Sequence, residues 1–184
     1  DICGRGPVAA AQTGRVRHSF RMSAWHGDSP VEILDWLDQA LRTGGDGVLC
    51  TAAVAALERA ADGTFELTCA LGGHPPPVLC RADGSVEYFG EYGTLLGTDL
   101  TVHNVAVSTA LGPDEAVFFY TDGVTDAPPP HQLSQSQLLG LVGEAWADLP
   151  DASVLADRVL AEADRTLGLD ERTDDIALLV FRRT

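Results

Sequence analysis

The sequence predicts an α+β fold, in which pairs of helices flank antiparallel β-strands. Three observations carry this prediction. Apolar residues recur at helical spacing near both ends of the chain, the middle consists of short apolar runs separated by Asp-Gly turns, and one more apolar run closes the sequence. The order of helix pair, strand meander, helix pair and final strand suits an antiparallel sheet system covered by helices.

The first helix is predicted from Gly6 to about Trp25. Pro7 lies in its first turn, where the missing N–H of proline costs nothing, and the alanine-rich run that follows favours helix. Val16 and Phe20 are four residues apart, so we expect them to form a buried stripe on this helix.

A second helix is predicted after Ser29-Pro30-Val31-Glu32. This segment has the form of a capping box, in which the serine and glutamate side chains each accept a hydrogen bond from an N–H group at the helix start. Leu34, Leu37 and Leu41 follow at helical spacing, and Gly44-Gly45 predicts the end of the helix.

The middle of the chain predicts two β-hairpins. Apolar runs flank Asp62-Gly63 and Asp83-Gly84, and Asp-Gly between apolar runs is among the stronger short-range hairpin signals. The four expected strands cover residues 48–57, 65–71, 78–80 and 86–89.

The second half of the chain returns to helices. A strand over residues 116–120 leads to Asp122, and Pro128-Pro129-Pro130 then predicts an extended break. Helices are expected over about 134–149 and 153–167, followed by a final strand over 176–181.

Length and composition narrow the possible functions. The 184 residues, 45% of them hydrophobic, predict a single domain over 1–184. The net charge of −15, from 27 acidic and 12 basic residues, disfavours binding to nucleic acid or to an anionic bilayer. No apolar run approaches the roughly 18 residues that span a membrane, so we expect no membrane insertion. Protein or small-molecule partners are favoured.

The cysteines predict a reducing compartment. Cys3, Cys50, Cys69 and Cys80 lack Cys-x-x-Cys spacing and stand among apolar or small residues, which indicates reduced core thiols rather than disulfides or a zinc site. We therefore expect a cytoplasmic protein.

Aspartates at three turns are the candidate functional residues: Asp1, Asp122 and Asp174. Carboxylate oxygens on tight turns are the ligands that Mg²⁺ and Mn²⁺ prefer, so the first hypothesis is a metal-activated hydrolase. Each motif alone has a simpler interpretation. Asp122-Gly123 is a common turn pair, Asp174-Asp175 could be a solvated acidic pair, and the glycine loop before the first helix could be only a cap.

The combination of motifs, in its order along the chain, is more specific. It comprises Asp1-Ile2-Cys3-Gly4-Arg5-Gly6-Pro7-Val8-Ala9-Ala10, Gly72-Gly73-His74-Pro75-Pro76-Pro77, Gly93-Thr94-Leu95-Leu96-Gly97, Tyr120-Thr121-Asp122-Gly123-Val124-Thr125-Asp126 and Asp174-Asp175-Ile176-Ala177-Leu178-Leu179-Val180. With these motifs the chain resembles the bacterial SpoIIE and RsbU type of PP2C-like (PPM) serine/threonine phosphatases, from its first residue to its last.

The resemblance implies a β-sandwich flanked by helices, with two divalent cations, Mn²⁺ or Mg²⁺, at one end. A metal-bound water would attack phosphorus, and no protein side chain would act as nucleophile. The implied ligands are Asp1, which would bridge the metals, the backbone carbonyl of Ile2, Asp122 and Asp174, with Gly4, Gly123 and Asp175 beside the site. The implied substrate is a phosphorylated protein, a small anti-anti-sigma-factor-like regulator in a partner-switching pathway.

The chain departs from the family pattern at a few places. An upstream motif that supplies a further aspartate ligand has no counterpart, so we expect the first strands and first metal-binding motif of the domain to precede this sequence. Asp126 replaces a common glutamate, Ala177 replaces a frequent threonine, and residues 128–136 diverge from the family.

Other interpretations stay open. A catalytically degenerate phosphatase fold could act as a binding or signalling module, and a structural Ca²⁺ domain is disfavoured because the chain lacks an EF-hand loop. His74 has no second ligand at metal-binding spacing, which favours a role in ordering its loop. Arg15, Arg17 and Arg21 could dock a phosphoprotein, but at spacings of two and four they spread around the helix, which favours a solvated face.

Overall fold

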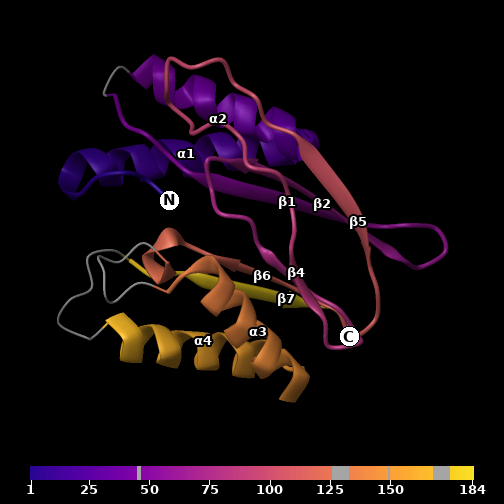
Figure 1. The fold of residues 1–184 in the computed structure, drawn as a ribbon. Coiled ribbons are helices and arrows are strands. Elements are labelled where there is room, and N and C mark those ends of the chain that lie inside the picture. The colour runs from indigo at the N-terminus through magenta and orange to yellow at the C-terminus, as the bar shows by residue number, and fades with distance from the viewer. Residues whose placement is uncertain (45–46, 126–132, 149, 168–174) are drawn as a thin grey trace. The chain divides into compact units, whose positions relative to one another are not determined.

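The computed structural model describes residues 1–44, 47–125, 133–148, 150–167 and 175–184, and it confirms the α+β class (Figure 1). The chain divides into two compact units. Unit 1 comprises Asp1–Pro76 and Gly90–Ala110, and unit 2 comprises Pro77–Phe89 and Leu111–Thr184. Each unit contains one antiparallel sheet and one pair of helices. The single domain over 1–184 stays a prediction.

The sheet of unit 1 has the strand order β1-β2-β5, formed by β1 (Ala52–Arg59), β2 (Phe65–Gly72) and β5 (Ala106–Leu111). The predicted hairpin at Asp62-Gly63 is confirmed. Gly63 has a φ of 86°, which favours glycine, and the Thr64 N–H donates a hydrogen bond of 2.9 Å to Asp62 Oδ1.

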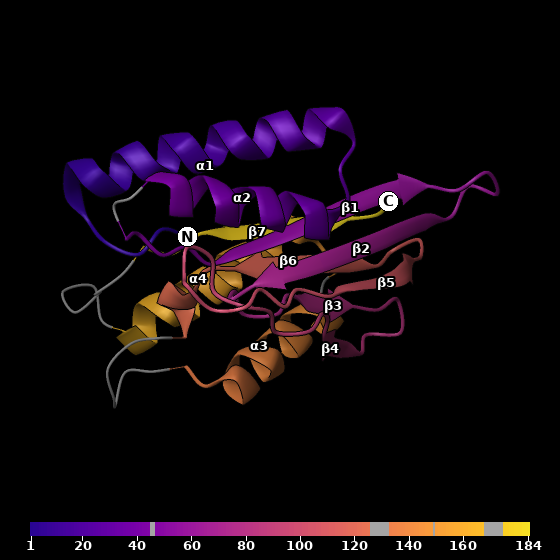
Figure 2. The same cartoon turned by 90° about the horizontal axis from the view of Figure 1, so that it is seen from above.

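Helix α2 (Pro30–Gly44) packs on this sheet, and α1 (Gly6–His26) packs on α2 (Figures 1 and 2). The predicted capping box is confirmed, because the Ser29 N–H donates to Glu32 Oε2 over 2.7 Å and the Glu32 N–H donates to Ser29 Oγ over 3.4 Å. The core beneath α2 consists of buried Ile33, Leu34, Leu37, Leu41, Cys50, Val54, Ala70 and Leu96.

The buried stripe predicted for α1 is wrong. Val16 is half-buried, but Phe20 is 41% exposed. The buried residues of α1 are instead the polar Gln12 and Ser23. The Arg15 guanidinium lies where a side chain at Gly44 would be, so glycine permits close approach of α1 and α2. Val16 packs against the apolar core beneath α2, but Phe20, one turn further along α1, does not share this contact.

The sheet of unit 2 has the strand order β4-β3-β6-β7, and its neighbouring strands are antiparallel. Its strands are β3 (Val78–Cys80), β4 (Val86–Tyr88), β6 (Ala116–Tyr120) and β7 (Leu178–Arg182). The predicted strands 78–80 and 116–120 are confirmed at both ends. The final strand begins at Leu178 rather than at residue 176, because residues 175–177 instead hydrogen-bond to Thr121.

Helices α3 (Gln135–Asp148) and α4 (Ala152–Leu167) cover this sheet. Trp146 anchors α3, because its buried indole N–H donates to the Arg81 carbonyl over 2.9 Å. Leu149, the predicted end of α3, lies outside the described residues. The core of unit 2 includes buried Val78, Cys80, Phe118, Tyr120, Val124, Leu138, Val142, Leu155 and Val159.

The cysteines are free thiols, as predicted, but they are not all in the core. Cys50, Cys69 and Cys80 are buried, whereas Cys3 is exposed because it belongs to the turn that precedes α1. Among the described helices, none is both long and apolar enough to cross a membrane.

Candidate metal-binding residues

The predicted ligands Asp1 and Ile2 lie in unit 1, beside a short backbone pairing. The Thr51 N–H donates to the Asp1 carbonyl, and the Cys3 N–H donates to the Leu49 carbonyl, both over 2.9 Å. These bonds place Ile2 opposite Cys50 in an isolated antiparallel bridge and use none of the backbone groups of Ile2. The Ile2 carbonyl therefore points away from the paired segment, as a backbone ligand must.

Gly4 lies in the turn between this segment and α1. Its φ of 117° lies in a region that non-glycine residues avoid, although a Cβ there would meet no atom within 4 Å. Its requirement for glycine is thus conformational. The turn ends at Pro7, which stands in the first turn of α1 as predicted.

The Gly-Gly-His-Pro motif and the Gly93–Gly97 loop pack backbone against backbone within unit 1. A Cβ at Gly73 would lie 2.8 Å from the Leu95 Cα, and the Gly73 N–H donates to the Gly93 carbonyl over 3.1 Å. His74 is only 7% exposed, and its Nδ1 lies 2.9 Å from the Pro75 carbonyl oxygen. These contacts favour the predicted loop-ordering role of His74.

Asp122 lies in unit 2, directly after β6. It opens the short 3-10 helix η1 (Asp122–Val124), in which the Val124 N–H donates to the Thr121 carbonyl over 3.1 Å. The Thr125 N–H then donates to the Asp122 carbonyl over 2.7 Å. These bonds fix the backbone of the turn. They do not use the Asp122 carboxylate, which can therefore act as a metal ligand.

The segment that precedes β7 is fastened to the same turn. The Thr121 hydroxyl accepts from the Ala177 N–H over 2.9 Å and donates to the Asp175 carbonyl over 3.0 Å. A Cβ at Gly123 would overlap the Asp175 carbonyl oxygen and lie 3.0 Å from its carbon. Glycine at position 123 therefore lets the Asp175 backbone reach the Asp122 turn.

The Asp122 carboxylate fits a metal ligand. Its Oδ1 is buried and has no hydrogen-bond partner among the residues that the structure describes. A buried carboxylate oxygen without a partner costs on the order of 1–3 kcal/mol or more. A hard divalent cation would offset this cost, because it binds carboxylate oxygens.

The structure brings together only part of the predicted set. Asp122, Gly123 and Asp175 lie together in unit 2, while Asp1, Ile2 and Gly4 lie in unit 1. Asp174 and Asp126 lie outside the described residues. Within the described ranges, no group of three or more His, Cys, Asp or Glu side chains could hold a metal ion. The complete ligand set, including the expected upstream aspartate, stays a prediction.

Sequence reasoning missed two residues that hold these loops. Thr121 stands in a quoted motif, but its bonds to residues 175 and 177 could not be read from the sequence. Asp38 on α2 is 5% exposed and accepts the Gly97 N–H over 2.8 Å, which ties the helix to the Gly93–Gly97 loop. An acidic residue among the leucines of an amphipathic helix was the available signal for Asp38.

Antiparallel sheets, each covered by a pair of helices, match the PP2C-like fold. The chain belongs to the stage II sporulation protein E (SpoIIE) family, whose model matches residues 1–184. The predicted resemblance is thereby confirmed.

Solved structures agree with this assignment. The RsbU and RsbW domains of Rv1364c from Mycobacterium tuberculosis match with 28% identity and a TM-score of 0.77, over 100% of this chain and 50% of theirs. This chain thus spans half the length of the chain in that structure. The SiaA-PP2C domain of Pseudomonas aeruginosa matches with 21% identity and a TM-score of 0.80, over 100% of this chain and 73% of that one.

A third match is the manganese-presoaked phosphatase domain of the cell fate determinant SpoIIE from Bacillus subtilis. Its identity is 14% and its TM-score is 0.57, over 94% of this chain and 73% of that chain. At such identities the SiaA and SpoIIE matches establish the fold alone.

Proposed function

We propose that this chain is the catalytic domain of a metal-dependent protein serine/threonine phosphatase. The observation that carries the proposal is the Asp122 turn, where a buried carboxylate oxygen without a described partner stands beside a glycine that admits the Asp175 backbone. Membership of the SpoIIE family supports the reaction class.

The proposed cofactors are two divalent cations, Mn²⁺ or Mg²⁺, held by Asp1, the Ile2 carbonyl, Asp122 and Asp174. The chemistry that such cations supply when bound is activation of water and neutralisation of the phosphoryl oxygens. The chain itself orients the ligands. Thr121 fixes the residues after Asp174 against the Asp122 turn, and the bridge to Cys50 directs the Ile2 carbonyl.

The proposed substrate is a phosphoserine or phosphothreonine on a partner protein in the cytoplasm. A small anti-anti-sigma-factor-like regulator is the substrate class that we favour. RsbU and RsbW domains occur together in the Rv1364c structure, and the present chain aligns with half of that chain. This match is consistent with such a substrate class and is the support for it.

The test is hydrolysis of p-nitrophenyl phosphate and of a phosphothreonine peptide by a full-length version of the protein, which we expect to supply the upstream aspartate ligand. We expect turnover with Mn²⁺, loss of turnover in EDTA, and no effect of reagents that modify serine nucleophiles. Turnover that persists in EDTA would contradict the metal mechanism. Mn²⁺ binding without any turnover would favour a phosphatase fold that acts only as a binding module.

A further inference from the structure

Helix α1 differs in charge from the rest of the chain. The protein carries 27 acidic and 12 basic residues, but α1 contains no aspartate or glutamate in its 21 residues. It contains three arginines and two histidines: Arg15, Arg17, Arg21, His18 and His26. A helix of this composition produces a local positive field on a protein whose net charge is −15.

One side of α1 gathers these cations with large apolar side chains. Arg17, Arg21 and Trp25 follow one another four residues apart, and His18 and Met22 form the adjacent row. We call these five residues the α1 face. All five are exposed, and Trp25 is 86% exposed. Arg15 does not belong to this face, because its guanidinium packs against Gly44 of α2. Arg17 and Arg21 are exposed to solvent, as predicted, and they lie on a different side of α1 from Arg15.

The arginines of the α1 face lack the acidic partners that other arginines have. Neither Arg17 nor Arg21 forms an ion pair or hydrogen bond with any residue that the structure describes. Ion pairs to aspartate or glutamate are formed by Arg42, Arg81, Arg158, Arg165 and Arg182. In a chain with excess acid, this leaves Arg17 and Arg21 available to carboxylates from outside.

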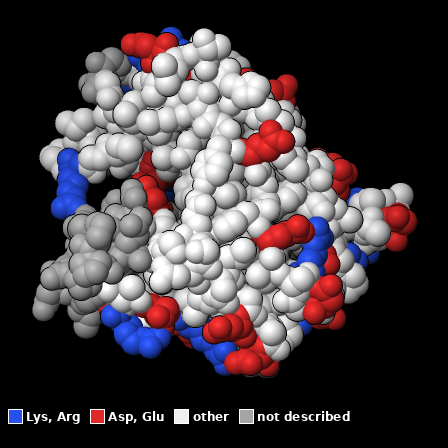
Figure 3. Space-filling view, viewed as in Figure 1, with Lys and Arg blue, Asp and Glu red and all other residues white. Residues whose placement is uncertain are grey.

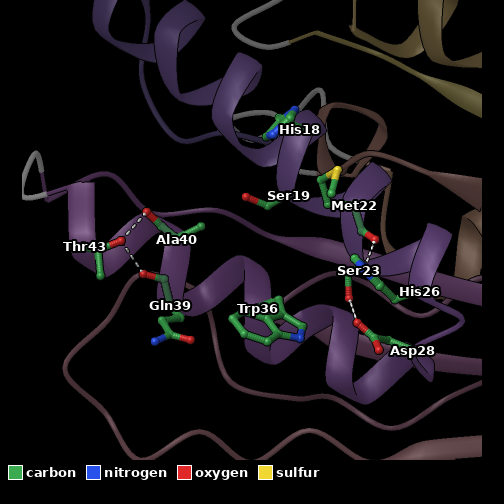
Figure 4. Close-up of a pocket in the computed structure, with 10 residues that line it drawn as sticks. All are labelled: His18, Ser19, Met22, Ser23, His26, Asp28, Trp36, Gln39, Ala40 and Thr43. Carbon is green, nitrogen blue, oxygen red and sulfur yellow. Dashed lines mark hydrogen bonds between the residues drawn. The ribbon is translucent and has the colours of Figure 1, made fainter.

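Hollows beside the α1 face provide space for apolar side chains. A groove of about 610 Å³ runs between α1 and α2, with Met22 on one wall and Trp36 on the other (Figure 4). A second hollow of about 560 Å³ includes Arg17, Arg21 and Trp25, and it shares His18 and Met22 with the groove. The groove lies within unit 1, on helices whose mutual packing is described.

We propose that the α1 face and its groove bind an acidic amphipathic helix of a partner protein. Carboxylates of that helix pair with Arg17 and Arg21, and its apolar side chains enter the groove between Met22 and Trp36. Tryptophan and arginine are the residues that most often dominate binding energy at protein interfaces, and methionine adapts to varied apolar shapes. This inference goes beyond the proposed phosphatase activity and does not rest on it.

The charge of the protein favours an acidic helix over two other possible partners, an anionic membrane and a second copy of this chain. An anionic membrane would present its charge to a wide area of a protein whose net charge is −15. Acidic groups are also scattered over the side of the molecule that Figure 3 shows, which is viewed as in Figure 1. A second copy bound through the same face would bring Arg17 and Arg21 toward their own counterparts, since a two-fold contact repeats one surface. An acidic helix confined to the α1 face avoids both of these repulsions. The one carboxylate among the described residues that line the groove, Asp28, accepts a hydrogen bond from the Ser23 hydroxyl and would meet the apolar side of the bound helix.

The test uses two fluorescent peptides of about 18 residues, long enough to form helix when bound. Both have leucines at helical spacing, with glutamates on the flanks of one and lysines on the other. We expect the glutamate peptide to bind the protein at micromolar concentration, at least about tenfold more tightly than the lysine peptide. The double variant R17E/R21E should reverse this preference, and Trp25→Ala should weaken binding of both peptides.

The matched control is R158E/R165E on α4, which makes the same change in net charge at exposed ion pairs that contribute little to stability. This control should keep the peptide preference of the wild type. Three results would overturn the proposal: equal binding of both peptides, equal loss in the control, or binding by R17E/R21E that is unchanged. Attachment to phosphatidylserine vesicles, or a dimer in sedimentation, that R17E/R21E abolishes would assign the face to those occupants instead.

Discussion

At the scale of single residues, the buried Oδ1 of Asp122 makes the most specific prediction. Asp122→Asn keeps the shape of the side chain and removes the charge that a cation requires. We expect Mn²⁺-dependent hydrolysis to fall at least about 100-fold, the scale of losing a major electrostatic contribution. Mn²⁺ should raise the melting temperature of the wild type but not that of Asp122→Asn, which gives a measurement independent of turnover.

Asp175→Asn is the control for Asp122→Asn. The Asp175 side chain is exposed, and the contacts that the turn makes with this residue are to its backbone carbonyl. The amide variant should therefore cost much less activity. A larger loss in Asp175→Asn than in Asp174→Asn would show that the ligand at this motif is the second aspartate.

Gly123 gives a prediction about stability. A Cβ at this position would overlap the Asp175 carbonyl oxygen, so Gly123→Ala must displace either the turn or the segment before β7. We expect a loss of about 1–3 kcal/mol in the free energy of unfolding, measured by urea denaturation. Gly140→Ala is the control, and we expect it to raise the free energy of unfolding rather than lower it. No atom lies within 4 Å of a Cβ there, so alanine should stabilise α3.

The sequence reveals some of these residues and hides others for a physical reason. An aspartate followed by glycine after an apolar run predicts a turn at a strand end, and Asp122 lies in one. Thr121 and Asp38 act through partners that are 54–56 and 59 residues away in sequence. Such contacts depend on the folded arrangement of distant segments, which local patterns do not contain.

At the scale of secondary-structure elements, the capping box of α2 is the part of the fold that a single substitution tests most directly. Ser29→Ala removes the acceptor of the Glu32 N–H and a partner of the Glu32 carboxylate. We expect the free energy of unfolding to fall by about 1 kcal/mol in chemical denaturation. Ser29→Thr retains a hydroxyl and should keep most of the stability. An equal loss in both variants would argue that the cap contributes nothing.

Element prediction succeeded where a local signal exists. Strands 78–80 and 116–120 and the Asp62-Gly63 hairpin follow from apolar runs and turn residues, and the structure contains them. Strand β5 (Ala106–Leu111) was missed. Its side chains alternate between exposed positions and the half-buried or buried positions of Val107, Thr109 and Leu111. Only two of these inward residues are strongly apolar, so the apolar run is weak, and pairing with β2 completes the strand, with the Ser108 hydroxyl 2.8 Å from that of Thr68.

At the scale of the whole molecule, the chain crosses between the two units more than once. Unit 1 receives residues 90–110 after the chain has already entered unit 2. No composition shift or linker marks these crossings in the sequence, and hence the division could not be predicted. The acidic excess, by contrast, is a property of composition. Against this excess of acid, two arginines on α1 without an ion-pair partner among the described residues are informative.

Each unit contains a buried thiol that makes the stability of the protein depend on pH in the alkaline range. Burial raises the pKa of Cys69 in unit 1 and of Cys80 in unit 2 from 9.0 to about 12. The folded protein therefore keeps protons that the unfolded chain releases between these pH values. It follows that the free energy of unfolding falls as pH rises above 9.0, by up to about 1.4 kcal/mol per pH unit for each thiol.

Urea denaturation at pH values between about 8 and 11, in steps of about one pH unit, measures how the free energy of unfolding depends on pH. Cys69→Ala and Cys80→Ala should each make the decline with pH shallower, although each also lowers stability at every pH by leaving a small cavity. Cys3→Ala is the matched control for loss of a thiol, because Cys3 is exposed rather than buried. Because tyrosines also titrate in this range, the slope difference between wild type and variant decides the result. Identical slopes in the wild type and in both buried variants would contradict the prediction. They would mean that Cys69 and Cys80 lose their protons at the same pH in the folded protein and in the unfolded chain.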